Sequence, residues 1–131
     1  MMSNILDNLR YTSSHEWVLD NADGTVTVGI TDHAQSLLGD VVFIETPDAG
    51  LQVNAGEEFT VIESVKAASS AYAPVGGEVI AFNDALESNP EIVNQEPYTE
   101  GWIVKLKPTD LTELDNLLSA TAYQELVEAE E

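Results

Sequence analysis

Hydrophobic and polar residues alternate over short stretches through the first 107 positions, which is typical of β-strands. In the stretch 25–30, valine or isoleucine at 26, 28 and 30 alternates with threonine or glycine between them. This strand is therefore expected to bury one face and leave the other open. The stretch His15–Leu19 precedes it, and the Asp-Gly pair at 23–24 favours a tight reversal, so the two strands are predicted to form a hairpin.

Five further strands are predicted, with breaks at Pro47, Pro74 and Pro90. They are Val41–Glu45, Glu57–Ser64, Ala67–Tyr72, Gly77–Phe82 and Trp102–Leu106. In the last of them, Trp102, Val104 and Leu106 share one face. The other face carries Ile103, Lys105 and Lys107, so both lysines are expected to be solvated.

Helical patterns are brief until the chain passes Pro108. The stretch 31–38 predicts a short helix, capped by Thr31 and ended by Gly39. Beyond Pro108, leucines at 111, 114, 117 and 118 recur at helical spacing, and Asp110 with Glu113 resembles a capping box. A further turn of helix places Tyr123, Leu126 and Val127 on one side, and the acidic end, with Glu128, Glu130 and Glu131, is expected to fray in solvent.

These elements predict a mainly β fold: a small sandwich with short helices and a helical C-terminal tail. Since no linker or shift in composition divides the chain, residues 1–131 are expected to form one domain. Its core is expected at about 11–107, and its C-terminal helical segment at about 110–128.

The charge is strongly negative: 24 Asp and Glu face four Lys and Arg, for a formal net charge of −20. Such a surface repels phosphate backbones and anionic lipid, so nucleic-acid and membrane-surface binding are not expected. The acidity suits partners with basic patches, although it can also serve solubility alone. The chain has no cysteine, which excludes a thiol nucleophile, and any redox chemistry must come from a cofactor.

The first ten residues resemble neither a secretory signal nor a basic transit peptide, and no stretch is apolar enough to span a bilayer. The expected location is the cytoplasm of a bacterium. A mitochondrial location stays open, because a transit peptide already removed would leave no trace.

Lys66 stands near the middle of two strand-like stretches, flanked by Gly56 on one side and Gly76-Gly77 on the other. This near-symmetry predicts that Lys66 projects into solvent from a hairpin tip, where a modifying enzyme could reach it. The small residues at 67–70 leave its surroundings open. By spacing alone, a plain exposed turn lysine is the favoured interpretation, since exposed lysines are the rule.

The segment Glu63-Ser-Val-Lys-Ala-Ala-Ser69 resembles the lipoylation segment of the glycine cleavage system H protein family. Further blocks, in the family's order and spanning about residues 4 to 127, resemble the same family. They are Tyr11–Val18, Gly29–Gln35, Leu38–Phe43, Ala73–Val79, Asn89-Pro90, Pro97-Tyr98, Gly101-Trp102 and Lys105–Pro108. The resemblance implies a barrel-sandwich hybrid fold, related to lipoyl and biotinyl domains.

The resemblance also implies a carrier without a catalytic site. Lipoate would be joined by an amide to Lys66, within a motif formed by Glu63, Ser64, Val65 and Ala67. Glycine decarboxylase (the P-protein) would load an aminomethyl group on the lipoyl arm. The aminomethyltransferase (the T-protein) would pass its methylene to tetrahydrofolate, and dihydrolipoamide dehydrogenase (the L-protein) would reoxidise the arm. A lipoate ligase or a lipoyl/octanoyl transferase would attach lipoate, and the carrier would be a monomer.

The family folds its loaded arm into a surface cleft, and the matching positions are Glu16, Ile30, His33 and Ser70. Glu16 would pair with the arm's cationic amine, while Ile30 would cover its apolar chain. The family usually has Asp where this chain has Ser70. We therefore expect a weaker hold on the loaded arm than in relatives with Asp.

His15 and His33 are not expected to bind a metal, because their spacing matches no metal pattern and they lie in different elements. Among rival carriers, a biotin site is disfavoured because both methionines stand at positions 1 and 2. The lipoyl domains of 2-oxo acid dehydrogenases usually show Asp-Lys-Ala, whereas this chain has Val65-Lys66-Ala67. A small carboxylate hydrolase has no distinctive acid pair, and a related carrier that relays lipoate to other enzymes stays open.

Overall fold

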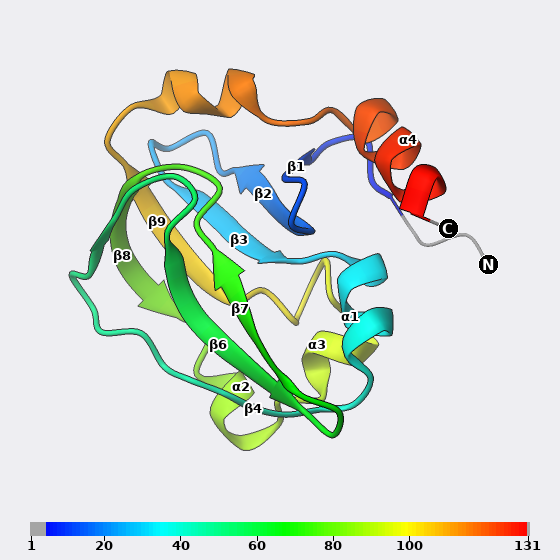
Figure 1. Cartoon of the computed structure of the whole chain (residues 1–131). Coiled ribbons are helices and arrows are strands. Elements are labelled where there is room, and N and C mark those ends of the chain that lie inside the picture. Colours follow the sequence, from blue (N-terminus) through cyan, green and yellow to red (C-terminus); the bar gives the residue numbers. More distant parts are fainter. Residues whose placement is uncertain (1–4, 131) are drawn as a thin grey trace.

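Two antiparallel β-sheets face each other in the computed structural model, which describes residues 5–130 (Figure 1). One sheet has the order β1-β2-β3-β9-β8-β5 and the other β4-β6-β7. The strands are β1 (Arg10–Tyr11), β2 (Glu16–Asp20), β3 (Val26–Ile30), β4 (Val41–Ile44), β5 (Gln52–Val53), β6 (Glu58–Ser64), β7 (Ala68–Tyr72), β8 (Gly77–Phe82) and β9 (Val104–Pro108). The helices are α1 (Asp32–Leu38), α2 (Ala85–Ser88), α3 (Ile92–Gln95), the 3₁₀ helix η1 (Leu111–Asn116) and α4 (Ala120–Glu130). The predicted mainly β sandwich with short helices is confirmed.

The main core lies between the two sheets. Val28, Val79 and Leu106 reach it from the six-stranded sheet, and Phe59 and Ile62 from the three-stranded sheet. Each of these side chains is buried. Burying an aliphatic or aromatic side chain of this size contributes about 1.5–3 kcal/mol, so this shared core holds the two sheets together.

A second apolar cluster covers the outer face of the six-stranded sheet. Because side chains alternate along a strand, Val18 joins the main core while its neighbour Trp17 joins the second cluster with Tyr123 of α4. Gly29 lies opposite Trp17, and a Cβ there would be 2.7 Å from the indole ring. Both faces of β3 are therefore covered, and the predicted open face is wrong: Thr27 is only 7% exposed.

The predicted first hairpin is confirmed, with Glu16 opposite Ile30 in the antiparallel pairing of β2 and β3. The short helix that follows is also confirmed. Thr31 caps α1 by accepting a 3.1 Å hydrogen bond from the backbone N–H of Ala34, and the helix ends at Gly39 with φ 76°. This glycine can adopt that conformation because it has no Cβ.

The strand predicted at 102–106 lies two residues further along, as β9. Ile103, expected beside the lysines on the polar face, is fully buried, and Trp102 is only half-buried and packs against the second cluster. Lys107 is exposed as expected, whereas Lys105 is half-buried with its Nζ 5.2 Å from the centroid of the Trp102 ring. The alternating pattern of apolar and polar residues predicted the wrong exposure for these side chains, because this sheet is covered on both faces.

The predicted capping box near Pro108 is wrong. The Asp110 carboxylate accepts a 2.9 Å hydrogen bond from the Thr112 N–H, but the Glu113 carboxylate accepts one of 2.9 Å from the Gly76 N–H. Glu113 therefore ties η1 to the loop before β8 instead of closing its own helix. The leucine spacing from 111 onward gives a 3₁₀ helix with Leu111 45% exposed.

The helical tail is confirmed as α4, which buries Tyr123 and Val127. The Tyr123 ring stacks on Tyr11 with a centroid separation of 4.5 Å. Glu128 is exposed as predicted. Glu130, however, belongs to the helix and contacts two histidine side chains, so it is not part of a fraying end. Glu131 lies outside the described residues.

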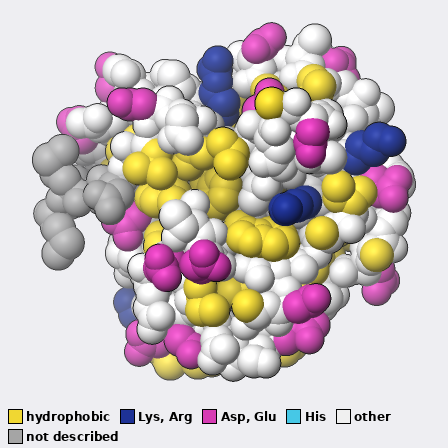
Figure 2. Space-filling view, turned by 180° about the vertical axis from the view of Figure 1, so that it is seen from behind, with side chains coloured by type: hydrophobic (Ala, Val, Ile, Leu, Met, Phe, Trp, Pro, Cys, Tyr) yellow, Lys and Arg dark blue, Asp and Glu magenta, His cyan; other side chains and the backbone are white. Residues whose placement is uncertain are grey.

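Four short elements were not predicted from the hydrophobic pattern: β1, β5, α2 and α3. Each has only two or four residues, too few for a period to show. Within residues 5–130, no helix combines the length and the apolar character needed to cross a membrane. On the face shown in Figure 2, acidic side chains surround a central apolar area and basic ones are sparse, as the composition requires.

Candidate functional site

Lys66 lies at the tip of the β6–β7 hairpin, as predicted. Glu63 pairs with Ala68, so residues 64–67 form the turn. The Ser64 N–H donates to the carbonyl of Ala67 at 2.8 Å, and the Ser64 hydroxyl oxygen accepts from the N–H groups of Lys66 and Ala67 at 3.2 and 3.3 Å. The Ser64 side chain thus braces the turn, while the Lys66 side chain is exposed to solvent.

A second brace joins this tip to the loop between α1 and β4. The Val65 N–H donates a 3.0 Å hydrogen bond to the carbonyl of Asp40. A Cβ added at Gly39 would lie 3.3 Å from Cε of Lys66, so the lysine stem lies close above this glycine. In Figure 1 the β6–β7 turn accordingly lies near the α1 end of the molecule, away from η1.

Replacing Gly39 with alanine is expected to destabilise the fold and disturb Lys66. At φ 76° and ψ −157° the backbone is in a region that glycine alone adopts easily, so the change should lower the free energy of unfolding by about 1–3 kcal/mol. The added methyl group also displaces the lysine stem. Urea unfolding measures the first effect, and the rate of enzymatic lipoylation the second. Gly24→Ala is the control, since Gly24 has φ 90° but open space around it and lies far from Lys66 in the sequence. Equal lipoylation rates in the two variants would contradict the role given to Gly39.

Exposed apolar side chains surround the tip. Val65 is 66% exposed beside Lys66, and Leu37 at the end of α1 is 58% exposed. Val42 and Phe43 on β4, the strand paired with β6, are 54% and 51% exposed. Lys66 thus offers an approaching enzyme an exposed amine with apolar surface beside it.

A groove of about 120 Å³ lies between α1, the start of β2 and the β6–β7 hairpin. Three of the four predicted cleft residues line it: Glu16, Ile30 and Ser70. The other lining residues are Ser14, His15, Ala34, Leu37, Leu38, Ile62 and Ser69. The groove therefore combines an apolar floor with a few polar groups, as small-molecule sites usually do.

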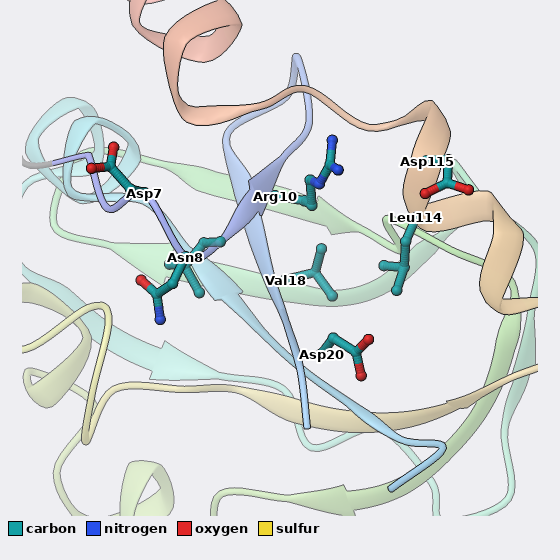
Figure 3. A pocket seen from close by; sticks show the side chains of 8 residues that line it. Asp7, Asn8, Arg10, Val18, Asp20, Leu114 and Asp115 are labelled. Atoms are coloured by element: carbon teal, nitrogen blue, oxygen red, sulfur yellow. The ribbon is translucent and has the colours of Figure 1, made fainter. Parts of the chain in front are cut away.

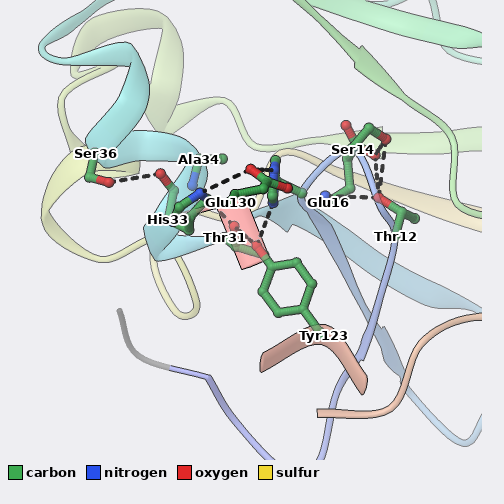
Figure 4. Close-up of polar contacts among 10 residues, drawn as sticks. Thr12, Ser14, Glu16, Thr31, His33, Ala34, Ser36, Tyr123 and Glu130 are labelled. Carbon is green, nitrogen blue, oxygen red and sulfur yellow. Dashed lines mark hydrogen bonds and ion pairs between the residues drawn. The ribbon is translucent and has the colours of Figure 1, made fainter. Parts of the chain in front are cut away.

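Glu16 is the buried acid of this groove, with 1% of its surface exposed. One carboxylate oxygen accepts hydrogen bonds from the hydroxyls of Thr12 and Ser14 at 2.6 and 2.5 Å (Figure 4). The other accepts from the Tyr72 N–H at 3.3 Å. Burial raises the pKa of Glu16, and these hydrogen bonds partly oppose the rise. Within residues 5–130 no basic side chain forms an ion pair with it. A buried carboxylate held without a cation is costly, which marks this position as a functional candidate.

Ser70 faces a carboxylate on the neighbouring strand. Its hydroxyl donates a short hydrogen bond to Glu58 of β6. The chain thus places an exposed acid beside the Ser70 position of the predicted cleft. Nothing in the sequence pattern singled out Glu58, because the contact depends on the β6–β7 pairing.

The remaining cleft candidate, His33, does not line the groove. It is 6% exposed and turns toward His15 and Glu130: the two imidazole rings lie 4.7 Å apart, and His33 Nε2 is 3.5 Å from a Glu130 oxygen. Figure 4 shows His33 and Glu130 side by side near the Tyr123 hydroxyl. This cluster could not be predicted from the sequence pattern, because Glu130 is 115 positions from His15.

Residues 9–130 match the model of the glycine cleavage H-protein family. The chain belongs to this family. It is 65% identical over 130 residues to a glycine cleavage system H protein of Chromohalobacter salexigens, covering 99% of each chain. It is 58% identical to the corresponding protein of Salmonella typhimurium, covering 98% of this chain and all of that one. A crystal structure of the Mycobacterium marinum H protein superposes with a TM-score of 0.86 at 36% identity, over 95% of this chain and 99% of the other.

As a glycine cleavage H-protein, the chain is the lipoyl-carrying shuttle of the glycine cleavage system and catalyses no step itself. The family's cofactor is a lipoyl group on a lysine. Membership of this system makes the P-, T- and L-proteins its partners. The biotin-carrier, dehydrogenase-domain and hydrolase interpretations are thereby set aside.

A different hollow, of about 240 Å³, lies between the N-terminal residues and η1 (Figure 3). Its charged lining residues are Asp7, Arg10, Asp20 and Asp115. None of these residues belongs to the predicted lipoylation motif or to the groove beside Lys66. We assign this hollow no part in the carrier function.

Proposed function

We propose that lipoate is attached to this chain through an amide to Nζ of Lys66, and that residues 1–131 act as one lipoyl-carrier domain. The observation that carries the proposal is the position of Lys66, exposed at a braced hairpin tip beside a groove with a buried acid. Its neighbours Glu63, Ser64, Val65 and Ala67 form the motif that a lipoate ligase or a lipoyl/octanoyl transferase would read. The proposal also includes a monomeric state and a cytoplasmic location, the latter supported by the bacterial source of the relatives.

The described residues fit the cofactor. The Lys66 side chain is exposed, and β7 runs from the turn along the groove to Ser69 and Ser70. These serines are three and four residues after Lys66, so even a fully extended chain would place them no more than about 10–13 Å away. A long lysyl-lipoyl chain has the reach for this path. When attached, lipoate supplies a disulfide that takes up the aminomethyl group of glycine. Since the chain has no cysteine, no protein thiol competes in exchange with that disulfide.

Within the groove, we assign the buried carboxylate of Glu16 to the cationic amine at the end of the loaded arm. The hydroxyls of Thr12 and Ser14 fix one carboxylate oxygen, which leaves the group oriented before the arm arrives. Ile30 and Ile62 supply apolar surface for the chain of the arm. Together these residues would limit the access of water to the aminomethyl group.

Ser70→Asp is expected to lengthen the lifetime of the loaded form, and more so with Glu58→Gln. The introduced carboxylate attracts the arm's amine, but in the single variant Glu58 lies beside it and the two acids repel each other. Partly exposed charges contribute about 0.5–1 kcal/mol, so the double variant should slow decay about two- to fivefold. The measurement is ammonia release from the isolated loaded protein, with Glu58→Gln alone as the control. An unchanged decay rate in the double variant would contradict the assignment of Ser70 to the cleft.

Reconstitution tests the proposed function as a whole. The lipoylated chain is mixed with P-protein, pyridoxal phosphate, glycine and labelled bicarbonate, and incorporation of label into glycine is followed. Exchange that depends on the lipoylated chain is the expected result. Exchange that is equal with the lipoylated and the unlipoylated chain would overturn the proposal.

A further inference from the structure

Three side chains from distant parts of the sequence converge beside the groove. His15 precedes β2, His33 lies on α1 and Glu130 ends α4. One ligand atom from each lies within 4.8 Å of the others. His15 and His33 belong to different elements, but the fold packs those elements together, so this separation does not prevent the two histidines from sharing a metal ion.

We propose that His15, His33 and Glu130 form a binding site for a divalent transition-metal ion, with zinc as the best fit. A Glu130 oxygen lies 3.1 Å from His15 Nε2 and 3.5 Å from His33 Nε2. Ligand atoms about 2.1 Å from one metal in tetrahedral geometry lie about 3.4 Å from each other. The two distances to Glu130 thus already match the spacing that zinc requires, and the two histidine ligand atoms lie within 4.8 Å of each other.

His33 gives independent support, because its Nε2 atom is buried and has no hydrogen-bond partner among the described residues. The side chain is 8% exposed, and this nitrogen lies on the side of Glu130, 3.5 Å from its oxygen. A buried polar atom left unsatisfied usually costs about 1–3 kcal/mol, and such atoms are rare in folded proteins. A metal ion between the three groups would satisfy it.

The second nitrogen of His15 is held as metal-binding histidines usually are. Its Nδ1 is 2.8 Å from the hydroxyl of Tyr123, which is 2.7 Å from Oγ1 of Thr31. When Nδ1–H donates to Tyr123, the lone pair of Nε2 points toward the Glu130 carboxylate. Two acceptors would then lie 3.1 Å apart unless a proton or a metal ion stands between them.

The donor set determines the kind of metal. Two imidazoles and one carboxylate suit zinc, and also cobalt or nickel, whereas magnesium and calcium prefer oxygen ligands alone. Three protein ligands leave a coordination position for water or another group. Because His15 also lines the groove, the ion would lie at its edge and would tie α4 to α1 and to the start of β2.

Zinc titration of the unlipoylated full-length chain tests this site. Excess magnesium occupies the many surface carboxylates, and calorimetry then follows zinc binding. One zinc per chain is expected, with affinity reduced at least tenfold in Glu130→Gln and unchanged in Glu128→Gln, which alters an exposed acid of the same helix. Glu130 is 42% exposed, so its replacement should leave the core intact.

Two further readouts make the result decisive. Zinc should raise the melting temperature of the wild type and of Glu128→Gln but not of Glu130→Gln, because the ion binds the folded state. Cobalt should give visible absorption bands that are lost in Glu130→Gln. Equal zinc affinity in the two glutamate variants, or no binding above the magnesium background, would overturn the site. Lys66→Arg should bind zinc as the wild type does, so failure of the lipoyl assignment would leave this result untouched.

Discussion

Lys66→Arg should reduce P-protein-dependent exchange of bicarbonate into glycine to the background of the unmodified chain. Lipoate attachment needs a free amine that acts as a nucleophile, whereas a guanidinium stays protonated and forms no such amide. Arginine keeps the positive charge and much of the length of the side chain, and the backbone bonds that brace the turn do not involve the side chain of residue 66. The fold should therefore be unchanged, and the loss of exchange should reflect the missing attachment.

The matched control is Lys107→Arg, which alters an exposed lysine on β9, outside the lipoylation motif. It should be lipoylated and should support exchange at the wild-type rate. Both variants should also show wild-type unfolding curves. Exchange by Lys66→Arg clearly above the background would mean that another group carries the aminomethyl unit.

Glu16→Gln should shorten the lifetime of the loaded arm by about tenfold or more. A hydrogen bond to a charged group contributes about 1.5–3 kcal/mol, and each 1.4 kcal/mol changes a rate about tenfold. Glutamine keeps an oxygen that accepts from Thr12 and Ser14 but loses the negative charge opposite the amine. Ammonia release from the isolated loaded protein measures the effect.

Although Glu16→Gln should shorten the lifetime of the loaded arm, it is not expected to destabilise the fold. Burying an unpaired carboxylate is costly, and burial raises the pKa of Glu16, so the neutral amide should leave the melting temperature unchanged or raise it. Glu125→Gln, an exposed change on α4, controls for a general effect of removing charge. A Glu16→Gln protein that is unstable yet holds its cargo normally would show that the acid serves the fold and not the arm.

The sequence sufficed for features that depend on neighbouring residues. The hairpin of β2 and β3, the Thr31 cap of α1 and the exposed tip at Lys66 follow from local alternation, capping and glycine spacing. The identity of the carrier did not follow from these patterns. It came from the resemblance along most of the chain, because many proteins expose a lysine on a turn.

Features that depend on contacts between residues distant in the sequence could not be predicted from the sequence pattern. Thr27 and Ile103 are buried because a second apolar cluster covers the outer face of the six-stranded sheet. The alternation of residues along a strand does not predict such a covering layer. Glu113 reaches Gly76 instead of its own helix end, since a loop lies within range once the chain has folded. Likewise, the place of Glu130 beside two histidines depends on how α4 docks.

The proposed carrier function depends on one covalent bond, the amide between lipoate and Lys66, and peptide mass spectrometry tests that bond directly. The chain is expressed with a lipoate ligase and lipoate, digested, and mapped for the added lipoyl mass. The lipoyl group should appear on the peptide containing Lys66 and be absent from the peptides containing Lys105 and Lys107. An unmodified Lys66 peptide, or a lipoyl group on another lysine, would contradict the assignment of Lys66 as the attachment point.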